Sequence, residues 1–162
     1  MALREIRTDE DPILRKQSRK VTEINDRIKI LLEDMKETMI DANGVGLAAP
    51  QIGVLRRVIT IDVGEGVMKI INPEILEVRG TIIDIEGCLS IPGKSGTVER
   101  PEWVKLKYLN ENGEELIIEG TDLLARAICH EVDHLNGILY TDKVIEYCTE
   151  EEDDNEEYEE IL

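Results

Sequence analysis

The chain has 162 residues, 41% of them hydrophobic, and a formal net charge of −17. This length suits one domain with a substantial core, and no apolar run is long enough to cross a bilayer, which argues against a membrane protein. The excess of acidic residues disfavours direct binding to a nucleic-acid backbone, which needs clustered Lys and Arg. The charged N-terminus has no apolar signal-peptide core, and the cysteines are odd in number, so we expect a cytoplasmic protein with reduced thiols.

The first predicted elements along the chain are helical. Residues 11–18, DPILRKQS, begin with a capping Asp followed by Pro, which favours a short helix. Residues 22–42 have apolar side chains at steps of three and four, which predicts a longer amphipathic helix. Residues 43–53, NGVGLAAPQIG, contain three glycines and a proline and are expected to form a loop.

Beyond this loop the sequence changes to short runs rich in β-branched residues, which predict strands. The runs cover residues 55–63, 69–80, 81–86, 97–110 and 114–120. Asn112 and Gly113 predict a tight hairpin between the last two. A final helix should begin near Thr121 or Asp122, either of which can cap it, and end at 136–137. This order predicts an α+β fold in which mostly antiparallel sheets pack around the last helix.

Helical spacing divides the last helix into two stripes. Leu123, Ala127, His130 and His134 follow one another at steps of four, three and four, so they share one side. The adjoining stripe should face the core, and it consists of Leu124, Ile128 and Leu135.

Residues 130–134, HEVDH, contain both histidines of the chain. Positions four apart lie on one face of a helix, so His130 and His134 can bind one metal ion while Glu131 holds a water beside it. The competing interpretation is two ordinary histidines on an amphipathic helix.

A catalytic metal site normally has three protein ligands and one open position, so a third ligand is needed. Cys129 points about 100° away from His130 around the helix. Cys148 lies in an acidic C-terminal segment. Cys88, in EGCLS after a predicted strand, is best placed to supply a thiolate. A glutamate is the main competitor as third ligand, and a buried inert cysteine is the alternative interpretation of Cys88.

Three stretches together resemble the signature of the peptide deformylase family: GVGLAAPQ at 44–51, EGCLS at 86–90 and HEVDHLNG at 130–137. The resemblance implies removal of the formyl group from N-formylmethionyl peptides of nascent proteins, with release of formate. It also implies antiparallel sheets around a central HEXXH helix. The partners would be nascent polypeptides at the ribosome, with no direct nucleic-acid contact and no membrane.

The resemblance implies one metal ion bound by Cys88, His130 and His134. The usual ion of the family is Fe²⁺, with Zn²⁺, Ni²⁺ or Co²⁺ as substitutes. Ligand chemistry alone favours Zn²⁺, because sulfur and nitrogen donors in tetrahedral geometry suit it.

The resemblance also implies the catalytic roles. A metal-bound hydroxide would attack the formyl carbon, with Glu131 as general base. The side-chain amide of Gln51 and the backbone N–H of Leu89 would stabilise the charge on the formyl oxygen. Asp133 and Ser90 are expected to support structure rather than react.

Two glycines suggest how a peptide substrate binds. Gly44 and Gly46 allow a peptide to approach as an added strand, and Gly46 is expected to contact the substrate main chain. Simple loop flexibility is an equally good interpretation of both glycines. Val45, Leu123 and Ala127 are candidates for the methionine pocket.

We expect a catalytic domain over residues 1–145 and an acidic tail or helix over 146–162. Between Val144 and Leu162 there are ten Asp and Glu and no Lys or Arg. A solvated acidic segment is the simplest interpretation, and a partner-binding segment is the alternative.

Two other functions compete with deformylation. A peptide-bond-cleaving metallopeptidase would lack its usual downstream ligand. A structural Cys-His-His zinc module would leave Glu131 and Gln51 without a role, and would unfold on chelation.

Overall fold

The computed structural model describes residues 2–149 and 161–162. The helices in these ranges are α1 (Asp26–Asp41) and α2 (Asp122–Leu135), with short 3-10 turns at Pro12–Arg15, Ala49–Ile52 and Tyr140–Asp142. The strands are β1 (Gly46–Ala48), β2 (Val58–Ile61), β3 (Met68–Arg79), β4 (Ile82–Cys88), β5 (Ile91–Arg100), β6 (Trp103–Leu109), β7 (Glu115–Thr121) and β8 (Val144–Tyr147).

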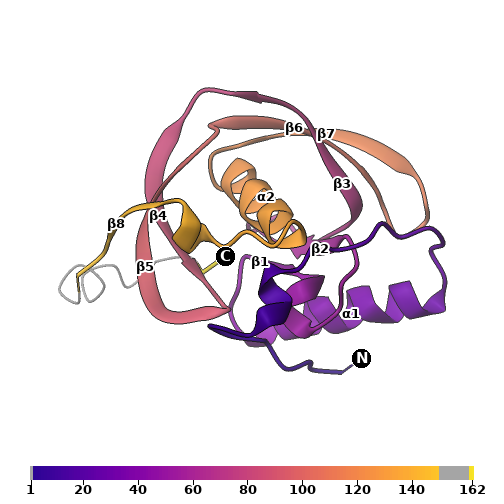
Figure 1. Cartoon of the computed structure of the whole chain (residues 1–162). Helices are drawn as coiled ribbons and strands as arrows, with labels where there is room; N and C mark the ends of the chain where they lie inside the picture. Colours follow the sequence, from indigo (N-terminus) through magenta and orange to yellow (C-terminus); the bar gives the residue numbers. More distant parts are fainter. Residues whose placement is uncertain (1, 150–160) are drawn as a thin grey trace.

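The strands form two antiparallel sheets. The larger has the order β1-β2-β3-β6-β7 and the smaller the order β4-β5-β8. Figure 1 shows α2 in the middle of the molecule with the strands curving around it, and α1 outside them. The predicted α+β fold, with mostly antiparallel sheets around the last helix, is confirmed.

Strand β2 is buried on both faces because it lies between the two helices. Side chains alternate across a strand. Val58 therefore packs in one apolar cluster with Met35 of α1, and Ile59 and Ile61 pack in another with Ile128 of α2. This strand couples both helices to one sheet and fixes the position of α2 in the core.

Helix α2 buries the stripe that its spacing predicts. Ile128 and Leu135 are fully buried, and Leu124 packs against the same cluster while partly exposed. The helix ends at Leu135, as predicted. The predicted side-chain cap is wrong, because Thr121 precedes the helix but makes no capping hydrogen bond. Thr121 is also the last residue of β7, where pairing with Trp103 holds its backbone extended.

The N-terminal helices are shorter than predicted. Residues 11–18 form only the 3-10 turn from Pro12 to Arg15. Helix α1 begins at Asp26 rather than at 22, because the side chain of Asn25 caps it by accepting from the N–H of Ile28.

The segment predicted as a loop at 43–53 contains β1, whose Gly46 pairs with Ile61 of β2. Strand β5 starts at Ile91, upstream of the predicted 97, and β8 crosses the expected domain boundary at 145. Strands β1 and β8 are short, and β5 contains two glycines. Each becomes a strand because a neighbouring strand pairs with it. Local sequence does not encode that pairing. The rest of the acidic segment, residues 150–160, lies outside the described part of the chain.

Gly137 after α2 generates a stability prediction. Its φ is 72°, and a Cβ there would collide with the backbone carbonyl of Arg15. Gly93 has a φ of 78° and no atom within 4 Å of such a Cβ. We expect Gly93→Ala to cost about 1–2 kcal/mol from the left-handed backbone alone, and Gly137→Ala to cost about 1–3 kcal/mol more from the collision. Urea unfolding of both variants measures the difference; equal losses would contradict the collision.

Candidate metal centre

Three buried donor atoms from two elements converge inside the molecule. Cys88 ends β4, and His130 and His134 lie one turn apart on α2. The Sγ of Cys88 is 3.3 Å from Nε2 of His134, which is 3.2 Å from Nε2 of His130. All three donor atoms lie within 4.8 Å of one another. A tetrahedral ion with bonds of ~2.0–2.3 Å needs donors about 3.3–3.5 Å apart. The residues present therefore fit a metal ion.

The protonation of these residues also fits a metal. Burial, with the neighbouring His130, lowers the pKa of His134, so its imidazole is neutral and able to ligate. Burial, with the charge of Glu131, raises the pKa of the Cys88 thiol. A thiolate at this position needs a cation beside it.

Glu131 is the least satisfied polar group in the site. Its side chain is fully buried, and neither carboxylate oxygen has a hydrogen-bond partner among the described residues. Its Oε1 lies 3.9 Å from Nε2 of His130. Burial, and then the charge of Glu86, raises the pKa of Glu131. Burying a carboxylate without a hydrogen-bond partner costs free energy. The presence of Glu131 in such a place therefore points to a chemical role.

Gly46 makes room for this carboxylate. A Cβ on Gly46 would lie 2.7 Å from Oε1 of Glu131, so a larger residue would displace it. The structure thus gives Gly46 a role that the sequence analysis did not consider.

Glu86, which the sequence analysis did not single out, organises the site from behind. Its fully buried carboxylate accepts from Nε and Nη2 of Arg100 at 2.9 and 3.0 Å and from Nη1 of Arg126 at 2.6 Å. It also accepts from Nδ1 of His130 at 2.8 Å. Burial alone would raise the pKa of Glu86, but the bonds from His130 and Arg100 outweigh it and hold the pKa below its usual range. The ionised carboxylate therefore keeps the proton on Nδ1 of His130 and leaves Nε2 free to ligate.

A signal for Glu86 is present in the sequence. It stands two residues before Cys88, the spacing that puts two side chains on the same face of a strand. Arg126 stands four residues before His130, which places both on one face of α2. Asp133 continues the network outward, accepting from Arg100 at 2.7 Å and pairing with Lys143 at 2.9 Å.

The two predicted oxyanion donors lie beside Cys88. The amide oxygen of buried Gln51 accepts from the N–H of Ala48 at 2.9 Å. Its Nε2 donates to Oγ of Ser90 at 3.1 Å and lies 3.6 Å from Sγ of Cys88. The N–H of Leu89 donates to the terminal Leu162, at 3.2 Å.

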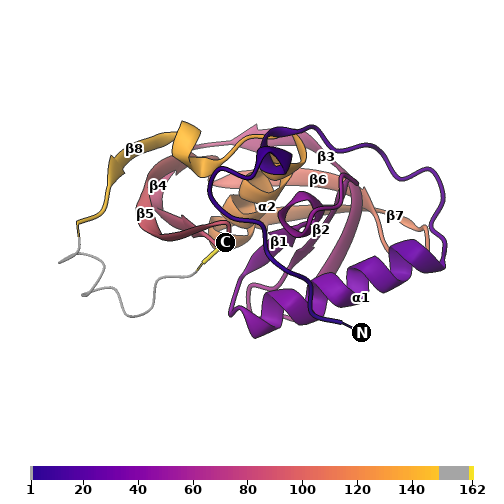
Figure 2. The same ribbon diagram turned by 60° about the horizontal axis from the view of Figure 1, so that its bottom comes forward.

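The residues predicted to bind substrate surround the last two residues of the chain. Gly44 forms a parallel bridge with Ile161. Leu162 shares a buried apolar cluster with Val45 and Ala127, and Leu123 packs against that cluster. Figure 1 and Figure 2 both place the C-terminus beside β1 and β5, close to α2.

The other two cysteines lie outside the donor set. Burial raises the pKa of Cys129 to about 11, and its sulfur is not part of the cluster. Cys148 is half-buried after β8.

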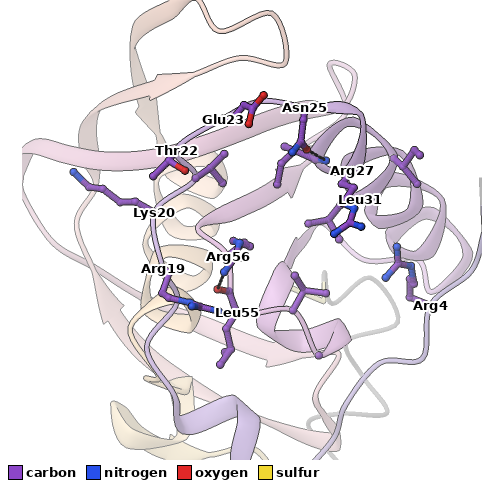
Figure 3. Close-up of a pocket in the computed structure, with 15 residues that line it drawn as sticks. Arg4, Arg19, Lys20, Thr22, Glu23, Asn25, Arg27, Leu31, Leu55 and Arg56 are labelled. Atoms are coloured by element: carbon purple, nitrogen blue, oxygen red, sulfur yellow. Dashed lines mark hydrogen bonds between the residues drawn. The ribbon is translucent and has the colours of Figure 1, made fainter.

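A separate hollow of about 860 Å³ lies between the N-terminal segment, α1 and the residues before β2. Figure 3 shows basic side chains around it: Arg4, Arg19, Lys20, Arg27 and Arg56. It contains none of the predicted site residues.

Taken together, the Cys-His-His cluster and a buried glutamate that has no hydrogen-bond partner among the described residues fit a metal-dependent hydrolase within an α+β fold. No helix in the described ranges has the length and apolarity to span a bilayer.

Comparison with known proteins identifies the family. The sequence profile described as polypeptide deformylase matches residues 3–150. A peptide deformylase of Alkaliphilus metalliredigens is 63% identical over 145 residues, which is 90% of this chain and 99% of that protein. One from Acetivibrio thermocellus is 62% identical over 152 residues, covering 94% and 89%. The crystal structure of the Thermotoga maritima peptide deformylase matches with a TM-score of 0.87 at 43% identity, covering 89% of this chain and 99% of that one.

The chain therefore belongs to the polypeptide deformylase family. Its activity is removal of the N-terminal formyl group from N-formylmethionyl peptides of nascent proteins, with release of formate.

Replacing one donor should empty the metal site without unfolding the chain. We expect Cys88→Ser to lose most of its bound metal, because a hydroxyl is a much poorer ligand than a thiolate. Cys148→Ser is the matched control and should keep one ion per chain. Elemental analysis of both proteins after anaerobic purification measures metal content and identifies the ion; full metal in Cys88→Ser would remove Cys88 from the ligand set.

Removing the charge of Glu86 should be strongly destabilising. Glu86→Gln removes the carboxylate from buried Arg126 and leaves Arg100 with Asp133 alone, which we expect to cost about 3–5 kcal/mol. Glu77→Gln is the control, because Glu77 also accepts two bonds from an arginine, Arg79, but on the surface. It should change stability by less than about 1 kcal/mol. Chemical denaturation of both variants tests this, and similar losses would contradict the role of burial.

Proposed function

We propose that Glu131 is the general base and acid of the deformylation reaction. It would accept a proton from the attacking water and return it to the leaving nitrogen. The observation that carries this proposal is its buried carboxylate, which has no hydrogen-bond partner among the described residues and lies 3.9 Å from His130. Because no hydrogen bond from the described part of the chain occupies its oxygens, this carboxylate can accept a proton from a water bound next to it.

We propose that Cys88, His130 and His134 hold one Fe²⁺, which Zn²⁺, Ni²⁺ or Co²⁺ can replace. The converging sulfur and two nitrogens support this ligand set. When bound, the ion supplies a Lewis acid that polarises the formyl carbonyl and lowers the pKa of a water. The protein contributes Glu86, which fixes the ring of His130.

The negative charge that develops on the formyl oxygen needs donors that are already in place. We assign them to the side-chain amide of Gln51 and the backbone N–H of Leu89. Gln51 suits this role because its oxygen is held by the N–H of Ala48, which turns its NH₂ group toward Cys88. Ser90 accepts from the same NH₂ group and orients it further.

The peptide substrate is proposed to enter as a strand between two backbone segments, at 44–46 and 87–89. Gly44, Val45 and Gly46 would provide one edge. The methionine side chain would enter the apolar pocket lined by Val45, Ala127 and Leu123, since these surround one buried leucine in the structure.

We propose that the enzyme works in the cytoplasm on nascent chains as they leave the ribosome. The net charge of −17 favours contact with the emerging peptide over contact with ribosomal RNA. The catalytic domain is assigned to residues 1–145, with β8 continuing its pairing to Tyr147. Residues 146–162 are assigned to the acidic tail of the chain.

The general base can be tested directly. Glu131→Gln keeps the shape of the side chain but cannot accept the proton, so we expect formate release from formyl-Met-Ala to fall by about 10²–10⁴-fold. Metal content should be unchanged, because Glu131 is not a ligand. Glu119→Gln, an exposed change on β7, is the control and should retain full activity. Wild-type turnover by metal-loaded Glu131→Gln would assign the base elsewhere.

A further inference from the structure

Ile161 and Leu162 lie in extended form between the backbone segments at 44–46 and 87–89, a space called the cleft below, and they pair with both segments. The N–H of Val45 donates to the carbonyl of Ile161 at 2.7 Å. On the other side the N–H of Leu162 donates to the carbonyl of Gly87 at 3.3 Å, and the N–H of Leu89 donates to Leu162 at 3.2 Å. These are the two backbone edges assigned above to the substrate.

The side chain of Leu162 fills the apolar pocket. It is 1% exposed, and it shares its cluster with Val45, Ala127 and Ile128. Burial of a leucine side chain is favourable, so this contact stabilises the position of the terminus. Ile161 is 38% exposed and faces a hollow of about 420 Å³ that runs over Gly87 and Leu89.

The group that accepts from the N–H of Leu89 is the main-chain oxygen of Leu162. Leu89 is one of the two donors assigned to the formyl oxygen. A single N–H cannot fully serve this oxygen and a formyl oxygen at once. Ile161 and Leu162 therefore occupy the apolar pocket, both backbone edges and the N–H of Leu89.

We infer that Ile161–Leu162 is a built-in competitor of the formylpeptide, which must leave the cleft before a substrate binds. This inference rests on the substrate placement proposed above. The terminus resembles a bound peptide in its main-chain pairing and its buried apolar side chain, but it carries no formyl group to hydrolyse. A tethered ligand acts at an effective concentration of about millimolar when its linker spans the site, so even a weak contact of this kind competes.

Competition predicts a change in KM without a change in kcat. A chain ending at Glu160 should have a KM for formyl-Met-Ala about 3- to 10-fold lower than the full chain, because the cleft is then open. Leu162→Asp should behave similarly, since it places a charge in the apolar pocket. Ile145→Asp is the matched control: it adds the same charge at an exposed isoleucine of β8, and its KM should equal that of the full chain. An unchanged KM in both the shortened chain and Leu162→Asp would overturn the inference.

A binding measurement separates this inference from the proposed chemistry. A fluorescent peptide with the sequence of residues 156–162, EEYEEIL, is titrated with metal-loaded protein and followed by anisotropy. The shortened chain should bind it several-fold more tightly than the full chain does. Equal binding to both chains, or none, would overturn the inference. A protein that binds the peptide in this way but releases no formate would instead contradict the proposed reaction.

Enzyme concentration distinguishes binding within one chain from binding between copies. The KM of the full chain should stay constant as its concentration is raised. A KM that rises with enzyme concentration would show that the terminus enters the cleft of a second copy, and would overturn the intramolecular contact.

Discussion

The buried ion network of Glu86 is the interaction on which the metal centre depends. One carboxylate of β4 holds Arg100 of β5, Arg126 of α2 and the ring of His130. Each of these charges would be costly to bury alone, and together they satisfy one another. The network therefore joins the smaller sheet to the central helix at the place where the three candidate metal ligands meet. The network also sets the orientation of the His130 ring. Its Nδ1 is bound to Glu86, so its Nε2 faces Cys88 and His134.

The side chains of this centre come from one strand and one helix, each with its own regular spacing. A strand places every second side chain on one face, and a helix places every fourth side chain on one face. On β4 this brings Glu86 and Cys88 toward α2, and on α2 it brings Arg126, His130 and His134 toward β4. Neither element contains a complete site. The chemistry arises because the core holds β4 and α2 against each other, with Gly46 leaving space for the glutamate between the two histidines.

The parts of the site that could be predicted from sequence are those set by local spacing. The histidine pair, the cysteine after a strand and the core stripe of α2 all follow from periods within a few residues. The Glu86 network was missed because it joins three elements distant in sequence, and β1 was missed because only pairing with β2 makes Gly46–Ala48 a strand. The terminus was missed for a different reason. Its acidic composition predicts a solvated segment, and that composition conceals two apolar residues, Ile161 and Leu162, at the end.

The position of those two residues shows how the cleft is constructed. The segment entering β1 belongs to the larger sheet, and the end of β4 belongs to the smaller one. At this point they do not pair with each other but with Ile161, which bridges Gly44 on one side and Gly87 on the other. Two unpaired backbone edges that face each other accept an extended peptide, because each main-chain group then gains a partner. Affinity in such a cleft comes mainly from backbone pairing and selectivity from the pocket beneath it. Since backbone pairing does not depend on sequence, any extended segment with a suitable apolar side chain competes for the cleft once it reaches it, and Ile161 with Leu162 is such a segment.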